Sequence, residues 1–291
     1  MVGEIVVTWE GKKLRFLTES RLGRSGQWIV DATTYFDAPE FKDPKVNWNI
    51  AKPRVLACIL HHAAGWYGPR LTENATPTAE FAFVLALARD HRERFKIGPG
   101  YNYIAFPSGR AWAVGRHGTH RAHTKGRDPA TLENWNVVGR SVCAAGDLSA
   151  EPMTNGLARA ITAAVADIGR LPGAVAGMPV YEHGLIPTVN SAGVRYSQAT
   201  DCPGRNLSAW RAAGGLVSQG EPVYEPDRWG EGYVAGYRSG FGMGAAEGSE
   251  AHQEAAEAAQ ARVAALITAP PVPAHVPAAP AVSRDSLVRA S

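Results

Sequence analysis

The hydrophobic and polar positions along the chain predict strands and helices that alternate through its central part. Residues with apolar side chains recur at helical spacing in two segments, 77–95 and 153–170, and the first of these follows a Thr-Pro helix start. Apolar runs that predict strands occupy residues 54–61, 101–106, 110–115 and 140–145. Elements in this order predict an α/β fold with a mixed central β-sheet flanked by helices, in a domain covering residues 51–215.

The first 50 residues show strand-like alternation of polar and apolar positions. Residues 4–8 and 13–18 alternate around the turn Glu10-Gly11-Lys12, and this pattern predicts a β-hairpin. We expect residues 1–50 to form a short N-terminal β element. Such an element either adds strands to the main sheet or makes a minor surface contact.

The C-terminal part of the chain differs in character from residue 216 onward. Glycine recurs at every fourth position from Gly232 to Gly248, with an aromatic residue following three of these glycines. Because each interior glycine costs a helix about 1 kcal/mol, such a helix needs a closely packed partner surface, which predicts self-association. A flexible glycine-rich linker is the alternative. We expect a helical appendage at residues 216–269 and a disordered Pro/Ala-rich tail at 270–291.

Composition and charge exclude several classes of protein. The formal net charge is only +3 over 291 residues, without the concentrated basic face that a nucleic-acid enzyme needs. No run of about 20 apolar residues predicts a membrane span, and the N-terminus shows no secretory signal. The three cysteines form no convincing disulfide framework. We therefore expect a protein of the cytoplasm, with Cys58 and Cys143 as buried packing residues.

Candidate metal ligands occur at the end of the first central strand and far downstream. His61-His62 closes the apolar run that begins at residue 54, Cys202 precedes a Pro-Gly turn, and His183 lies between them. A histidine just after a buried strand faces a cleft, and the turn fixes the direction of the cysteine. Two imidazoles and a thiolate can hold one Zn²⁺ ion and leave a fourth position open for water.

Four sequence blocks, spread over residues 54–211, resemble a known family. They are Ile59-Leu60-His61-His62-Ala63-Ala64-Gly65, the segment 100–106 with Ser108-Gly109-Arg110, Ala122-His123-Thr124, and Thr200-Asp201-Cys202-Pro203-Gly204. In this order they are similar to the zinc-dependent type 2 N-acetylmuramoyl-L-alanine amidases, which include phage endolysins and peptidoglycan recognition proteins. The first and last blocks are common separately and specific in combination.

The resemblance implies a zinc amidase that acts on bacterial peptidoglycan. It implies that His61, His183 and Cys202 are the zinc ligands. It also implies that Tyr101 and Thr200 lie beside the metal, where they hydrogen-bond the scissile carbonyl or the attacking water.

The resemblance implies a substrate contact for His123 at the rim of the cleft. We place His62 next to the site as a further substrate-binding candidate, although the residue after a ligand on an extended segment points the opposite way. Packing is therefore an equally open role for His62. His117 and His120 are expected to be loop residues, with a second zinc site as the less favoured alternative.

The chain departs from the family pattern at two places. Gly184-Leu185 follows His183 where the family usually has Arg-Asp, and residues 186–199 predict an inserted turn or hairpin between two ligands. Some family members carry a glutamate base on the strand that corresponds to residues 140–145, which here contains no carboxylate. Tyr101 and Thr200 are therefore expected to contribute more to catalysis.

Two other classes of function are kept as alternatives. A non-catalytic peptidoglycan-binding protein is one, although that branch of the family typically loses the cysteine. A peptidase that uses Cys202 as its nucleophile is the other, although Pro203 removes the following backbone N–H that often stabilises an oxyanion. A wall-degrading enzyme without an export signal is typical of a phage endolysin released through membrane holes, or of a lysin carried in the virion.

Overall fold

A computed structural model describes residues 2–19, 28–64 and 67–216 of the chain. The chain divides into two units, residues 1–230 and 231–291, and the second lies wholly outside the described residues. Apart from residue 216, the expected helical appendage, its self-association through Gly232 to Gly248 and the disordered tail also lie outside them. The domain boundaries expected at residues 50 and 215 stay predictions.

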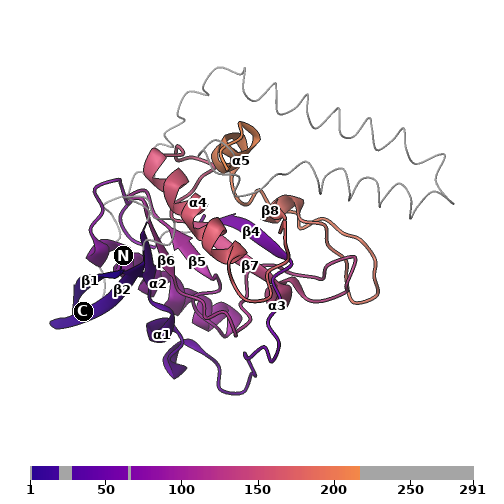
Figure 1. Ribbon diagram of the computed structural model, residues 1–291, viewed down its shortest axis with the longest axis horizontal. Coiled ribbons are helices and arrows are strands. Elements are labelled where there is room, and N and C mark those ends of the chain that lie inside the picture. Colours follow the sequence, from indigo (N-terminus) through magenta and orange to yellow (C-terminus); the bar gives the residue numbers. More distant parts are fainter. Residues whose placement is uncertain (1, 20–27, 65–66, 217–291) are drawn as a thin grey trace, which may run out of the picture. The chain divides into compact units, whose positions relative to one another are not determined.

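Within the described residues, eight strands form one sheet in the order β1-β2-β3-β6-β5-β7-β4-β8 (Figure 1). The strands are β1 (Val2–Trp9), β2 (Lys12–Glu19), β3 (Trp28–Asp31), β4 (Ala57–His62), β5 (Tyr103–Ala105), β6 (Arg110–Ala113), β7 (Gly139–Ala144) and β8 (Val180–Glu182). The helices are α1 (Thr33–Phe36), η1 (Pro39–Phe41), α2 (Pro77–Phe95), α3 (Trp135–Val138), α4 (Asn155–Gly169), η2 (His183–Leu185) and α5 (Arg205–Ala212).

The sheet is mixed, and helices cover both of its faces. Strands β8, β4, β7 and β5 pair in parallel, whereas β5 and β6 pair antiparallel. Alternate residues of a strand point to opposite faces. Accordingly, Val142 packs with the apolar residues of α4, and its neighbour Cys143 packs with those of α2. The predicted α/β class, with a mixed sheet between helices, is confirmed.

Capping side chains define where the two long helices begin. The Thr76 hydroxyl accepts the backbone N–H of Ala79 at 3.2 Å, and Pro77 occupies the first position of α2. The Thr154 hydroxyl caps α4 in the same way, accepting from Leu157 at 3.1 Å. Within the described residues, no helix is both long enough and apolar enough to span a bilayer.

The N-terminal strands extend the main sheet. Glu10 and Gly11 have φ angles of +48° and +73°, as expected of a hairpin turn whose two central residues both have positive φ. Strand β2 then pairs antiparallel with β3, and β3 pairs in parallel with β6. Phe16 of β2 packs against Phe81 of α2, with ring centroids 5.7 Å apart. The hairpin therefore adds strands to the main sheet, which is one of the two arrangements expected, and does not make only a minor surface contact.

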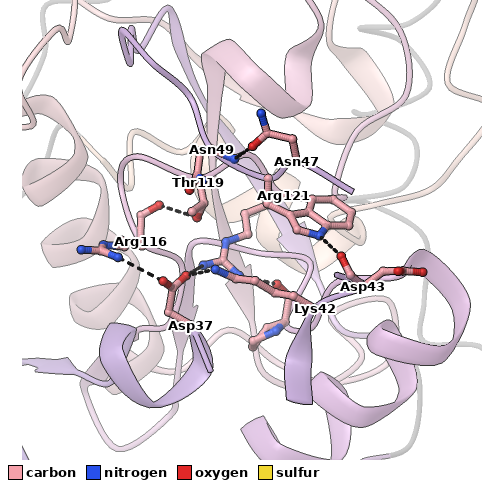
Figure 2. Close-up of polar contacts among 10 residues, drawn as sticks. Asp37, Lys42, Asp43, Asn47, Asn49, Arg116, Thr119 and Arg121 are labelled. Carbon is pink, nitrogen blue, oxygen red and sulfur yellow. Dashed lines mark hydrogen bonds and ion pairs between the residues drawn. The ribbon is translucent and has the colours of Figure 1, made fainter. Parts of the chain in front are cut away.

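A polar cluster joins the segment after β3 to the loop that precedes His123 (Figure 2). Asp37 forms ion pairs with Lys42, with Arg116 at 3.2 Å and with Arg121 at 3.9 Å. The side chain of Arg121 is fully buried, and burial lowers its pKa to about 10, while Asp37 acts in the opposite direction. Asp37 therefore stabilises a buried charge at the base of the loop.

We predict that Asp37→Asn destabilises the fold. The substitution leaves the buried Arg121 guanidinium without its carboxylate, which should lower the free energy of unfolding by roughly 3 kcal/mol in urea denaturation. The control is Glu4→Gln, which breaks the exposed pair between Glu4 and Arg15 and should cost at most about 1 kcal/mol. Equal, small losses for both variants would show that the Asp37 cluster does not stabilise the loop.

Candidate metal centre

Parallel strand pairing brings the two predicted histidine ligands together. His61 lies at the carboxyl end of β4, where its side chain is buried. In the pairing of β4 with β8, Leu60 lies opposite Glu182. The next residues along the chain are His61 in β4 and His183 at the start of η2, directly after β8. Their ring centroids are 4.5 Å apart. Cys202 reaches them from the loop before α5, with Sγ 3.6 Å from Nδ1 of His61.

These three side chains fit a zinc ion. Zn–S and Zn–N bonds of about 2.3 and 2.0 Å at tetrahedral angles separate sulfur and nitrogen by about 3.5 Å, close to the separation found between Cys202 and His61. All three potential ligand atoms lie within 4.8 Å of one another. In the described part of the chain, no other group of three His, Cys, Asp or Glu residues has this arrangement.

The electrostatics of the three side chains favour a cation. Burial, and then the nearby His183 and His123, hold the pKa of His61 well below its usual value. Burial also lowers the pKa of His183 to about 4, so both imidazoles are neutral at pH 7, the form that binds metals. Burial raises the pKa of the Cys202 thiol to about 12, and a bound cation would favour its thiolate.

Backbone hydrogen bonds hold the cysteine loop against the histidine turn. Gly184 donates its N–H to the backbone oxygen of Cys202 at 2.7 Å. The Thr200 hydroxyl accepts the N–H of Cys202 at 3.2 Å. A Cβ atom at Gly184 would collide with the backbone oxygen of Thr200 and lie 3.0 Å from that of Cys202. The glycine that departs from the family pattern therefore permits this close approach.

Tyr101 lies beside His61, with ring centroids 5.1 Å apart. Burial raises the pKa of its phenol well above the usual value, and the nearby Cys143 and Cys202 thiols act in the same direction. Cys143 is the residue opposite His61 in the pairing of β4 with β7. Tyr101 is therefore a neutral hydrogen-bond donor next to the ligands. Thr200 is exposed and lies two residues before Cys202.

His62 is buried away from solvent and has its own partners. Its Nδ1 accepts the backbone N–H of Leu148 at 3.0 Å and lies 3.5 Å from Asp147. These contacts show packing at the strand end, one of the two expected roles. Its role in substrate binding stays a prediction.

His123 lies close to the predicted ligands. Its ring centroid is 5.4 Å from that of His61, and it is 7 % exposed, so it lies deeper than the expected rim position. Asn136 accepts its backbone N–H at 2.8 Å and thereby fixes the loop. A contact between His123 and the substrate stays a prediction. His117 and His120 instead bond to the backbone oxygens of Pro172 and Asn47, and the described residues form no second metal group with them.

Two supporting side chains escaped the sequence analysis. His91 of α2 is buried, and its Nδ1 accepts the N–H of Gly100 at 2.9 Å, directly before Tyr101. The sequence could have indicated this role, because His91 lies in the apolar stripe with Leu87 and Ala88, where a polar residue needs a buried hydrogen-bond partner. Gln198 of the insertion raises the pKa of His183, against the larger effect of burial, and no pattern marks it in the sequence.

Comparisons with known proteins give structural similarities at low sequence identity. The wild-type Drosophila PGRP-LB structure is 17 % identical, with a TM-score of 0.45, covering 66 % of this chain and 97 % of that one. The endolysin N-acetylmuramoyl-L-alanine amidase LysCS from Clostridium intestinale is 15 % identical, with a TM-score of 0.37, covering 61 % and 97 %. The PGRP-LCa and PGRP-LCx ectodomain complex, with bound tracheal cytotoxin, is 17 % identical, with a TM-score of 0.43, covering 61 % and 90 %.

No protein-family model matches the sequence, and no curated protein matches it. The chain is thus similar in structure both to amidases and to peptidoglycan recognition proteins. At this level of similarity, a function has to be inferred from the side chains of the site.

We predict that the metal-free protein loses stability on mild acidification. Burial lowers the pKa of His91 to about 4, below the ordinary value of about 6.5. As the pH falls from 6.5 to 4, the unfolded chain binds a proton at this residue and the folded chain does not. The free energy of unfolding is therefore highest above pH 6.5. Below pH 6.5 it falls by up to about 1.4 kcal/mol per pH unit for each such histidine.

Urea denaturation at several pH values between 7 and 4.5, in chelator, measures this slope. His91→Gln should make the dependence shallower by the contribution of one histidine. An unchanged slope in His91→Gln would contradict the assignment.

We predict that Gly184→Ala weakens metal binding. The added methyl group meets two backbone oxygens, which cannot rotate away, and so displaces the Cys202 loop from His183. Zinc affinity, measured by competition with a chelator, should fall about tenfold or more. Gly118→Ala is the matched control, because a Cβ atom there meets nothing within 4 Å. Equal affinities for the two variants would refute the close-approach argument.

Proposed function

We propose that this protein is a zinc-dependent N-acetylmuramoyl-L-alanine amidase that cleaves the bond between muramic acid and L-alanine in peptidoglycan. The observation that carries the proposal is the convergence of His61, His183 and Cys202, with ligand atoms within 4.8 Å. A His/His/Cys set leaves a coordination position open, as catalytic zinc sites do. The four sequence blocks supply the substrate class.

The side chains around the three ligands support amide hydrolysis. When bound, zinc supplies a Lewis acid that acidifies water and polarises the scissile carbonyl. Tyr101 stays protonated because burial raises its pKa, so it is able to donate a hydrogen bond to developing oxyanion charge. Losing one such donor typically costs about 3 kcal/mol of barrier. Thr200 adds a hydroxyl beside Cys202, and its oxygen already accepts from the Cys202 N–H.

The same geometry counts against the two alternatives. A nucleophilic cysteine needs a lowered pKa, whereas burial raises that of Cys202 to about 12. Pro203 also offers no N–H to an oxyanion. A protein that only binds peptidoglycan has no need of a complete ligand set, so the presence of Cys202 beside His61 and His183 favours catalysis over binding alone.

We further propose that the protein is a phage endolysin or a virion-associated lysin. In this proposal it is made in the host cytoplasm and reaches the wall after release. Peptidoglycan is then its macromolecular partner. The support is the type of reaction, together with sequence blocks shared with endolysins.

Zinc content and cleavage test the proposal together. We expect about one zinc per chain by elemental analysis, and release of new amino termini and free lactyl-muramic ends from purified cell wall. His183→Ala should lose both the metal and the cleavage. His120→Ala should keep both, because His120 lies outside the metal group. Chelation should stop cleavage, and added zinc should restore it.

Two results would overturn the proposal. A parent protein that binds zinc but releases nothing from any wall tested would be a binding protein. Cleavage that survives complete removal of the metal would point to a cysteine nucleophile, and Cys202→Ser would then abolish this metal-independent cleavage.

A further inference from the structure

Side chains anchor the backbone on both sides of Tyr101, which lies two residues before β5. On the C-terminal side, the Asn102 N–H donates to the Ser141 hydroxyl at 3.1 Å, and the Asn102 side chain accepts the Ser141 N–H at 3.0 Å. On the N-terminal side, the Gly100 N–H donates to Nδ1 of His91 at 2.9 Å. The position from which the Tyr101 side chain leaves the backbone therefore depends on these two anchors.

His91 is a well-defined hydrogen-bond acceptor. Burial lowers its pKa to about 4, so the ring is neutral at pH 7 and carries one proton. Because a backbone N–H only donates, Nδ1 is the unprotonated nitrogen and the proton lies on Nε2. The ring packs against Phe95, with centroids 5.1 Å apart, and against Tyr101, with centroids 5.2 Å apart. These contacts hold the acceptor atom close to Gly100.

The close approach of α2 to this segment requires a glycine at position 100. A Cβ atom there would lie 2.8 Å from Nδ1 of His91 and 2.8 Å from the backbone oxygen of Ala122. The backbone oxygen of Gly100 also accepts the N–H of Ala122 at 3.1 Å, directly before His123. Gly100, held by His91, thus joins the backbone of Tyr101 to the loop that carries His123.

The Tyr101 ring lies next to two imidazoles. Its centroid is 5.1 Å from that of His61, a predicted zinc ligand, and 5.2 Å from that of His91. The hydrogen bond that His91 accepts comes from the Tyr101 segment and not from a predicted ligand. Loss of this bond should therefore displace Tyr101 and leave the ligand set complete.

We propose that His91 is a positioning residue for Tyr101. Its Nδ1 atom holds the Gly100 backbone and thereby keeps Tyr101 beside His61. This inference rests on the proposed function, because it concerns the hydrogen bond that Tyr101 donates during amide hydrolysis. Misplacing such a group by about 1 Å costs on the order of a hundredfold in rate.

Two substitutions at position 91 separate the hydrogen bond from packing. His91→Leu keeps an apolar side chain in the core and removes the acceptor, whereas His91→Asn restores an acceptor oxygen near the position of Nδ1 without the ring. With zinc bound and a soluble muramoyl peptide as substrate, His91→Leu should lower kcat by roughly ten- to a hundredfold. KM and zinc content should stay at the parent values, and His91→Asn should recover most of the loss in kcat.

A double-mutant cycle with Tyr101→Phe tests whether His91 acts through the Tyr101 hydroxyl. If it does, His91→Leu causes no further loss of kcat once that hydroxyl is absent. Three results would overturn the inference: losses that add fully, a kcat of His91→Leu equal to that of the parent, or equal losses in His91→Leu and His91→Asn.

A second measurement needs neither activity nor metal. In the parent, we expect a scalar coupling across the hydrogen bond between the Gly100 amide nitrogen and Nδ1 of His91, and three-bond couplings that show one χ1 rotamer of Tyr101. His91→Leu should give an averaged or altered rotamer, and His91→Asn the parent rotamer.

Absence of the coupling in the parent, or an unchanged Tyr101 rotamer in His91→Leu, would also overturn the inference. If the parent cleaves no wall, the proposed function fails, and these couplings alone decide whether His91 holds Tyr101 in place.

Discussion

The parallel pairing of β4 with β7 and β8 is the constraint on which the site depends. Parallel strands end at the same edge of a sheet, so residues at their carboxyl ends converge although they are distant in the sequence. This pairing places His61 next to Cys143 on one side and next to the position of His183 on the other. Helix α5 reinforces the arrangement, because Ser208 and Arg211 both bond to Glu182 at the end of β8. A shift in this register would separate the ligands even if every helix were intact.

Burial gives the cluster its chemical character. His61, His123 and His183 are all held neutral by removal from water, and the Cys202 thiol is held protonated. Grouping these side chains costs stability in acid, because the unfolded chain binds protons that the folded chain does not. The same burial suits a cation, since neutral imidazoles bind metal without first losing a proton, and charge interactions strengthen where water is excluded. Burial of these side chains therefore favours a bound cation, and the same burial lowers the stability of the fold in acid.

Supporting residues reach the site from three segments of the chain. His91 of α2 holds Gly100 beside Tyr101, Asn136 holds the backbone of His123, and the hairpin after η2 pairs through Val189 with Arg127 of the loop after His123. The segment after β3 acts at longer range, since Asp37 pairs with the buried Arg121 of the loop that leads to His123 (Figure 2). Parts of the chain that look peripheral in the sequence thus determine how rigidly the central side chains are held.

The sequence by itself predicted the two long helices, six of the eight strands and the candidate ligands, whereas β3 and β8 were not predicted. Periodicity predicted α2 and α4 because those helices bury a continuous apolar stripe, and a Thr-Pro start marked the first of them. The strand runs were visible because β4, β5 and β7 are buried on both faces. His61 and Cys202 were predicted from two of the sequence blocks and His183 from the resemblance that these blocks carry, and only the tertiary structure placed their ligand atoms within 4.8 Å. The contacts of Gly184 with the Cys202 loop left no sequence pattern. They arise from close approach between segments distant in the chain, which local periodicity does not encode.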